Sequence, residues 1–175
     1  ALWGERRVRL GPSLLLDAGL RVETGGAVAN AGAVRAAPRL AARWTRGETI
    51  VSAAAGRSWQ YLQARAPGPG FAGETVTRPV SLWLLADRAT PALRTDLATL
   101  GVERWLGGGW HASAQGYVRA TGGLLVPDPR DVPATDEALV VSGDERARGV
   151  ELSLRRVAGA WTGSVAYSLA RARVA

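Results

Sequence analysis

Runs of strictly alternating apolar and polar residues constrain the fold of this chain more than any other feature. The clearest run, residues 148–157, alternates three aliphatic side chains with three polar ones: Val150, Leu152 and Leu154 with Glu151, Ser153 and Arg155. After a short Gly-bearing connection, residues 161–170 alternate in the same way. A period of two places successive side chains on opposite faces of a β-strand. The two runs therefore predict an antiparallel hairpin.

Four such hairpins are predicted, over about residues 2–24, 39–60, 96–122 and 148–172. Their turns take about three residues, near Pro12, Gly47, Gly108 and Gly159, whereas the loops between hairpins, about 25–38, 61–93 and 126–147, are long. The strand lengths are close to the ~9–11 residues that a tilted strand needs to cross a bilayer, and short turns opposite long loops are typical of outer-membrane barrels. We predict an all-β fold, an antiparallel up-and-down transmembrane β-barrel, with residues 1–175 forming one segment of about eight strands.

Tryptophan and tyrosine residues concentrate near the ends of the predicted strands. Four lie close to short turns, Trp44, Trp105, Trp110 and Trp161, and four lie toward the long loops, Trp59, Tyr61, Tyr117 and Tyr167. Barrels place amphipathic rings at both membrane interfaces, where the ring is buried and its polar atom stays wet. We predict this role for Trp44, Trp105, Trp110, Trp161, Trp59 and Tyr167. The alternative is that these rings pack the ends of a soluble β-sandwich.

Composition excludes several other classes of protein. No stretch approaches the ~20 consecutive apolar residues of a transmembrane helix, and the chain has no Cys and only His111, so thiolate and multi-histidine metal sites are excluded. The net charge of +7 comes from 22 basic residues, all Arg and spread along the whole chain. Scattered charge of this kind is typical of a solvated surface. We therefore expect no nucleic-acid partner, no catalytic residues, no cofactor and no metal.

Two segments allow more than one interpretation. Residues 90–100 fit a helix, because Thr90 can cap it and Pro91 suits its first position, but they also fit a loop followed by a strand from about Asp96. The loop over residues 126–147 carries six acidic residues, Asp128, Asp131, Asp136, Glu137, Asp144 and Glu145. These could coordinate a hard cation such as Ca²⁺, although a solvated loop is the simpler interpretation.

Five segments resemble parts of the barrel of TonB-dependent outer-membrane receptors, the first of them a strand-turn-strand. They are residues 100–110 (LGVERWLGGGW), 147–156 (ARGVELSLRR), 161–169 (WTGSVAYSL), 14–23 (LLLDAGLRVE) and 38–44 (PRLAARW). Members of that family close roughly twenty-two strands around a plug domain that engages the energising inner-membrane TonB complex. No plug sequence is recognisable here, and the chain ends in Ala175 rather than in the usual aromatic residue. We expect a fragment, the C-terminal part of the barrel domain without the plug.

The resemblance implies TonB-dependent uptake of a scarce solute across the cell outer membrane, by binding and gating. The solute would be a small molecule such as a metal chelate, a cofactor or an oligosaccharide. In this interpretation Leu100, Val102, Val150, Leu152 and Leu154 face the lipid bilayer. The predicted lumen-facing, ligand-binding candidates are Glu103, Gln115, Tyr117, Arg119, Glu151 and Arg155. Two alternatives remain: a small closed eight-stranded barrel of structural or adhesive role, and a soluble basic β-sandwich that binds polyanions.

Overall fold

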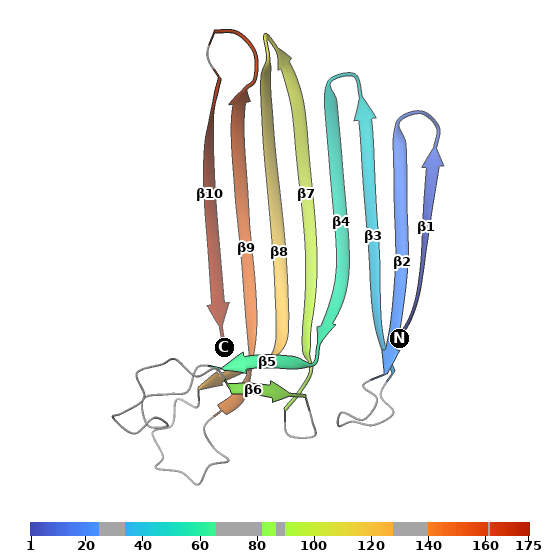
Figure 1. Cartoon of the computed structure of the whole chain (residues 1–175), viewed down its shortest axis with the longest axis vertical. Coiled ribbons are helices and arrows are strands. Elements are labelled where there is room, and N and C mark those ends of the chain that lie inside the picture. The colour runs from blue at the N-terminus through green and yellow to red at the C-terminus, as the bar shows by residue number, and fades with distance from the viewer. Residues whose placement is uncertain (25–33, 66–81, 87–89, 128–139, 161) are drawn as a thin grey trace, which may run out of the picture.

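The computed structural model describes residues 1–24, 34–65, 82–86, 90–127, 140–160 and 162–175, and these contain strands and no helix. Eight strands form one antiparallel sheet, the main sheet, in which neighbouring strands follow the order of the chain (Figure 1). β5 and β6 form a separate two-stranded ribbon. The strands of the main sheet are β1 (Leu2–Leu10), β2 (Leu14–Thr24), β3 (Val34–Arg46), β4 (Thr49–Gln60), β7 (Leu93–Gly107), β8 (Trp110–Pro127), β9 (Val140–Arg156) and β10 (Gly163–Val174). The predicted all-β, antiparallel up-and-down sheet is confirmed, and the sheet is open rather than closed.

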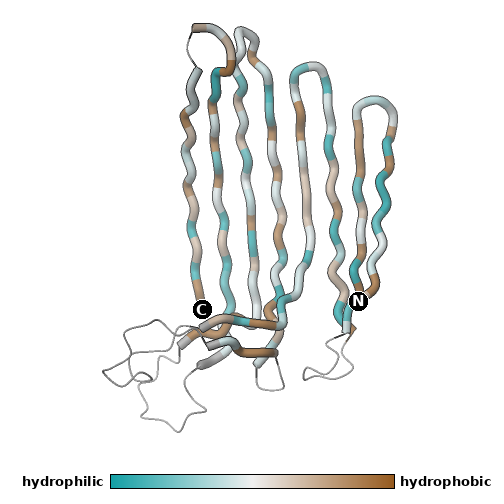
Figure 2. Tube along the Cα trace, viewed as in Figure 1, coloured by the Kyte–Doolittle hydropathy of each residue, from teal (hydrophilic) through white to brown (hydrophobic). Residues whose placement is uncertain are grey.

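Directly paired residues point to the same face of a sheet. Rows of paired residues across the eight strands therefore show which side chains share a face, and the central rows differ in polarity between the two faces. One continuous row is almost wholly apolar: Leu10, Leu14, Trp44, Val51, Val102, Ala114, Leu152 and Tyr167. The neighbouring row on the opposite face is largely polar: Arg9, Leu15, Arg43, Ser52, Gly101, Gln115, Glu151 and Ser168. We call these sides the apolar face and the polar face of the main sheet. Figure 2 shows the alternation along each strand.

Nothing in the described part of the chain covers the apolar face as a second layer. Leu100, Leu169 and Val118 on this face are 62%, 61% and 57% exposed, and no large side chain of the described residues is fully buried. A water-soluble sheet of this size normally buries one face against another layer. The described residues also contain no helix with the length and hydropathy needed to span a membrane.

The two ends of the main sheet differ (Figure 1). At one end, the turn end, short connections join the strands through glycines with positive φ, such as Gly11, Gly47 and Gly108. At the other, the loop end, lies the ribbon of β5 (Leu62–Arg65) and β6 (Leu82–Leu85). The buried side-chain amide of Gln63 holds the ribbon there, donating to the Gly123 carbonyl at 2.9 Å and accepting from the Leu125 amide at 3.2 Å.

The strands near the loop end are longer than the predicted hairpins. β3 begins at Val34, β8 extends to Pro127 and β9 begins at Val140, and each of these residues pairs with a neighbouring strand. The helix considered for residues 90–100 is wrong: residues 93–100 are part of β7, and 93 is paired with β4. The predicted long loop 61–93 contains the ribbon, whose strands of four residues are too short to show a period in the sequence.

Candidate functional site

The six predicted ligand-binding residues, Glu103, Gln115, Tyr117, Arg119, Glu151 and Arg155, all lie on the polar face. Each is paired in register with a residue of that face on a neighbouring strand of β7, β8 or β9. Three residues buried by the fold, Glu23, Thr121 and Ala147, also lie on this face near the loop end. The polar face is therefore partly enclosed at its loop end.

Three of the six candidates line one hollow of about 370 Å³ on this face. Glu103, Gln115 and Glu151 come from β7, β8 and β9, in two adjacent rows. The other polar side chains that line the hollow are Ser52, His111, Ser113, Ser153, Tyr167 and Ser168. The register predicts Tyr167 on the opposite face, so the side chains that define the hollow are the carboxylates, the amide, the imidazole and the serines. The imidazole Nε2 of His111 lies 3.7 Å from the Glu103 carboxylate.

The other three candidates are distributed around this hollow rather than inside it. The Tyr117 ring lies over Gly149, where a Cβ would come within 2.6 Å of it. Arg119 forms an ion pair with Glu145 toward the loop end. Arg155 is the register partner of His111 toward the turn end. The six residues thus form a polar strip along β7–β9, with a hollow at its centre.

The strip offers hydrogen-bond donors and acceptors of several kinds. Serine hydroxyls donate and accept, the Gln115 amide does both, and ionised carboxylates accept only. Such groups, arranged in a wet concave surface, can bind a polar solute by exchanging its water contacts for protein contacts. The described residues include no group of three or more His, Asp or Glu side chains that could hold a metal ion.

A second polar cluster on this face was not predicted from the sequence. Arg7 binds Asp17 at 2.6 Å, Arg39 pairs with Glu5, and Arg21 binds Glu23 at 2.8 Å. The Tyr61 hydroxyl also lies 3.3 Å from the Glu23 carboxylate. Arg21 and Glu23 are neighbours on one face of β2, but Arg7 and Asp17 are 10 residues apart and Arg39 and Glu5 are 34 apart. The register brings these two pairs together, and alternation alone identifies the face but not the pairs.

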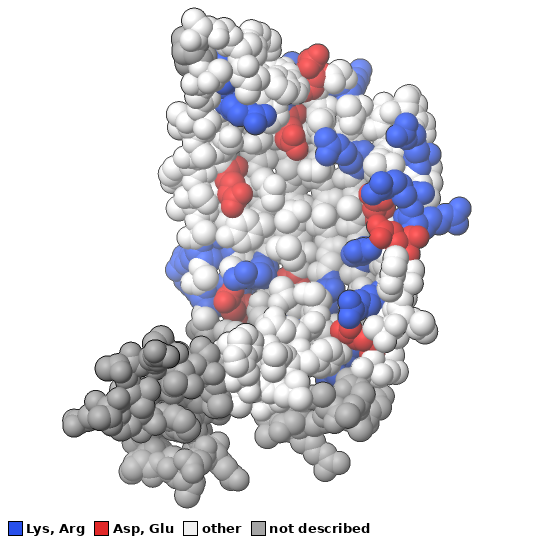
Figure 3. All heavy atoms as spheres, viewed as in Figure 1, with Lys and Arg blue, Asp and Glu red and all other residues white. Residues whose placement is uncertain are grey.

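Charges of both signs alternate over much of the face seen in Figure 3. In the main sheet the apolar face carries carboxylates only at Asp96 and Asp144 among its described residues, both near the loop end. Apart from Glu48 in the β3–β4 turn, the acidic side chains nearer the turn end therefore belong to the polar face, and this mixture of charge suits a solvated surface.

Of the predicted interface aromatics, Trp44, Trp110 and Tyr167 lie on the apolar face. Arg156 stacks over the Trp110 ring with its Cζ 5.7 Å from the ring centroid. Tyr167 shares a row with Trp44, nearer the turn end, and not near the loop end as the sequence suggested. The reason is that β10 begins at Gly163, only four residues earlier.

Trp105, another of the predicted interface aromatics, lies on the opposite face of the sheet from Trp44 and Trp110. It pairs with His111 on the polar face, and the two ring centroids are 4.9 Å apart. The strand keeps its alternation from Glu103 to Trp105, and the register shifts only between Trp105 and Gly107. Trp105 therefore points away from the face where the other turn-end rings lie. Trp161 is outside the described residues.

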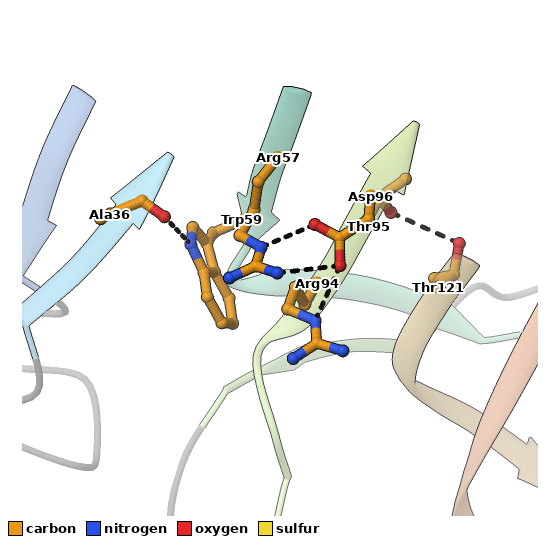
Figure 4. A network of polar contacts seen from close by, with 7 residues as sticks. All are labelled: Ala36, Arg57, Trp59, Arg94, Thr95, Asp96 and Thr121. Atoms are coloured by element: carbon orange, nitrogen blue, oxygen red, sulfur yellow. Dashed lines mark hydrogen bonds and ion pairs between the residues drawn. The ribbon is translucent and has the colours of Figure 1, made fainter. Parts of the chain in front are cut away.

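At the loop end, Trp59 lies beside the point where β3 and β4 stop pairing, beyond Arg39 and Gly56. Its indole Nε1 donates to the Ala36 carbonyl at 3.0 Å, which bridges the two strands. Figure 4 shows it next to a charged group in which Asp96 accepts from Arg57 at 2.6 and 3.1 Å and contacts Arg94 at 3.4 Å. By register these side chains belong to the apolar face.

The acidic loop offers little support for a cation site. Asp128, Asp131, Asp136 and Glu137 lie outside the described residues. Asp144 and Glu145 are successive residues of β9 and so point to opposite faces. Glu145 is already paired with Arg119.

No protein-family model matches this chain, and no curated protein matches it either. Among solved structures, it is similar to the FrpB iron transporter from Neisseria meningitidis, with a TM-score of 0.64 and 18% sequence identity. The match covers 98% of this chain and 25% of that one, so the chain spans about a quarter of the length of the FrpB chain. At this identity the likeness concerns the fold alone, and it supports the barrel-type antiparallel sheet expected from the sequence.

Proposed function

We propose that this chain is part of the wall of an outer-membrane β-barrel receptor that takes up a scarce solute. The observation that carries the proposal is the uncovered apolar face, which crosses all eight strands of the main sheet opposite a polar face. Large contiguous apolar surfaces on soluble proteins are rare and mark sites of interaction. In an outer-membrane barrel, such a surface contacts lipid while the polar face lines the lumen.

The likeness to an iron transporter supports a transport role over an adhesive one. The solute would be a metal chelate, a cofactor or an oligosaccharide, and the polar strip on β7–β9 would bind it through Gln115, Glu151 and the serines of the hollow. The inner-membrane TonB complex would energise release through a plug domain carried outside these 175 residues. We expect no chemical step, because the role of the strip is binding and gating.

Uptake by cells that produce the full-length protein tests this proposal. We expect the protein in the outer-membrane fraction, with a heat-sensitive shift on gels, and accumulation of a radiolabelled ferric chelate that a protonophore abolishes. Glu151→Gln should weaken accumulation while the gel shift stays unchanged. Ser58→Ala, on the polar face but outside the hollow, is the matched control.

Two results would contradict the proposal. One is recovery of the protein in the soluble fraction without detergent, which would favour the soluble sandwich. The other is energy-independent accumulation of every solute class offered, including oligosaccharides and cobalt-containing cofactors, which would indicate a passive or structural barrel.

A further inference from the structure

Four arginines form a compact group on the apolar face, close to the loop end. Arg148 pairs in register with Arg171, and Arg146 pairs with Arg173. We call these four residues the arginine patch. Directly opposed residues have Cβ atoms about 5 Å apart, and residues i and i+2 are about 7 Å apart along a strand. The four side chains therefore start from an area of roughly 5 by 7 Å.

The described residues provide no carboxylate partner for this patch. Six other arginines, in contrast, have one: Arg7, Arg21, Arg39, Arg57, Arg94 and Arg119. Like charges placed directly opposite each other destabilise a sheet. A single arginine near a membrane boundary is explained by its long stem, which lets the charge reach the headgroups. Two facing pairs in adjacent rows require a further reason.

The patch borders a groove of about 920 Å³ that crosses the apolar face from β3 to β10. Small and aliphatic side chains of the apolar face line much of it, including Leu40, Ala55, Ala98, Val118 and Ala120. The patch forms one side of this groove, and the Arg57–Asp96 pair contributes a further charged border. The groove thus combines an apolar surface with a concentrated positive charge at one end.

We infer that the arginine patch binds the phosphate groups of a membrane lipid whose acyl chains pack on the adjoining apolar surface toward the centre of the sheet, where Arg148 and Arg171 share a hollow with Leu100, Val150 and Leu169. Guanidinium groups bind phosphate bidentately, with charge-assisted hydrogen bonds. Two facing pairs of arginines suit a headgroup with two phosphates better than one with a single phosphate. The lipid would offset the repulsion within the patch and fix the height of the wall in the bilayer. This inference rests on the proposed function, because it requires the apolar face to meet lipid.

Native mass spectrometry of the full-length protein in detergent tests the inference. The probes are a diphosphorylated lipid A, its monophosphorylated form, phosphatidylethanolamine and inorganic phosphate. We expect tightest retention of the diphosphorylated lipid, and retention at least about tenfold weaker in the Arg148→Gln/Arg171→Gln variant, since hydrogen bonds to charged groups are strong enough for such a change. The control is Arg9→Gln/Arg43→Gln, which removes two arginines from the polar face and should retain the lipid.

Two outcomes would overturn the inference. Equal lipid retention by both double variants would mean that the patch does not hold the headgroup, and displacement of lipid by inorganic phosphate alone would indicate a site for free anions. A heat-sensitive gel shift, recorded on the same samples, separates these results from failure of the proposed function. If the shift is present and retention is independent of the patch, only the lipid inference fails.

Discussion

Replacing Leu152 with arginine would place a charge at the centre of the apolar face. On β9 this residue lies midway between Arg148 and Arg156, which share its face. Eight residue steps at about 3.3 Å each separate the two arginines by about 26 Å along the strand. A strand tilt of about 40° reduces this to about 20 Å along the membrane normal, close to the apolar band of about 25 Å in such barrels.

The position of Leu152 determines the size of the expected effect. An arginine on the lipid face costs about 2–4 kcal/mol at the bilayer midplane and about 0–1 kcal/mol near the interfaces. We therefore expect Leu152→Arg to lower the free energy of unfolding by about 2–4 kcal/mol. Ser153→Arg places the same side chain on the polar face, beside Ser113 and Ala166, and should cost less than about 1 kcal/mol.

Urea-dependent refolding of the full-length protein into lipid vesicles, followed by tryptophan fluorescence and the heat-sensitive gel shift, measures both values. Leu152→Ala separates lost apolar contact from the introduced charge. Since Leu152 is 45% exposed in the sheet, we expect this truncation to cost about 1–2 kcal/mol through lost contact with lipid. If Ser153→Arg destabilises the barrel as much as Leu152→Arg, the assignment of the two faces is wrong.

Three further substitutions test particular contacts. Gly149→Ala would place a Cβ 2.6 Å from the Tyr117 ring, so we expect a loss of about 1–3 kcal/mol in urea refolding; a Tyr117→Ala background should remove this loss, and an equal loss in both backgrounds would contradict the contact. Gly109 has φ +78°, and an added Cβ would lie 2.5 Å from the Cβ of Ala158, whereas at Gly108 the nearest atom would be 3.8 Å away. We expect Gly109→Ala to lower the free energy of unfolding by about 1–2 kcal/mol more than Gly108→Ala; equal melting temperatures would refute this. Asp96→Asn removes the carboxylate partner of Arg57 and Arg94. Because the Arg57–Asp96 pair is partly exposed, we expect the free energy of unfolding to fall by about 1 kcal/mol or less, and added salt to reduce this loss. A loss as large as that of Leu152→Arg would mean that the pair is buried.

The two faces of the sheet were predictable because alternation needs only the local sequence. Leu152 and Glu151 differ by one residue, and a period of two is sufficient to assign them to opposite sides. The six polar candidates were therefore placed together on one face from the sequence alone. The turn-end glycines were also evident, since short connections with Gly are characteristic of hairpins.

What could not be predicted depends on contacts between distant segments. The pairing of Arg39 with Glu5 requires the register of β1, β2 and β3, and the arginine patch requires that of β9 and β10. The ribbon of β5 and β6 consists of four-residue strands, and side-chain hydrogen bonds from Gln63, rather than any period, hold it in place. Residues 90–100 satisfied both a helical and an extended pattern, and pairing with β4 decided for the strand.

A final prediction concerns the two outer edges of the main sheet, because unpaired strand edges are not tolerated in lipid. Either β1 pairs with β10 in a closed eight-stranded barrel, or other strands complete a wider wall. An eight-stranded barrel has an interior just wide enough for side chains to fill. The polar face here carries ion-paired arginines such as Arg7 and Arg39, whose side chains are 67% and 61% exposed. In the structure β1 and β10 lie at opposite edges of the sheet (Figure 1). We therefore expect other strands to complete a wider wall.

The absence of Cys from the sequence allows a direct test by engineered disulfides. In the full-length protein, Leu169→Cys combined with Val150→Cys should crosslink on oxidation, because these residues are register partners and the Cα atoms of a disulfide lie about 4.4–6.8 Å apart. The same Leu169→Cys, or Val165→Cys, combined with Gly4→Cys on β1 should not crosslink, since a wide wall keeps β1 and β10 apart. A Gly4 crosslink as efficient as the control would mean that the eight strands close on themselves, and the receptor-wall proposal would then give way to a small closed barrel.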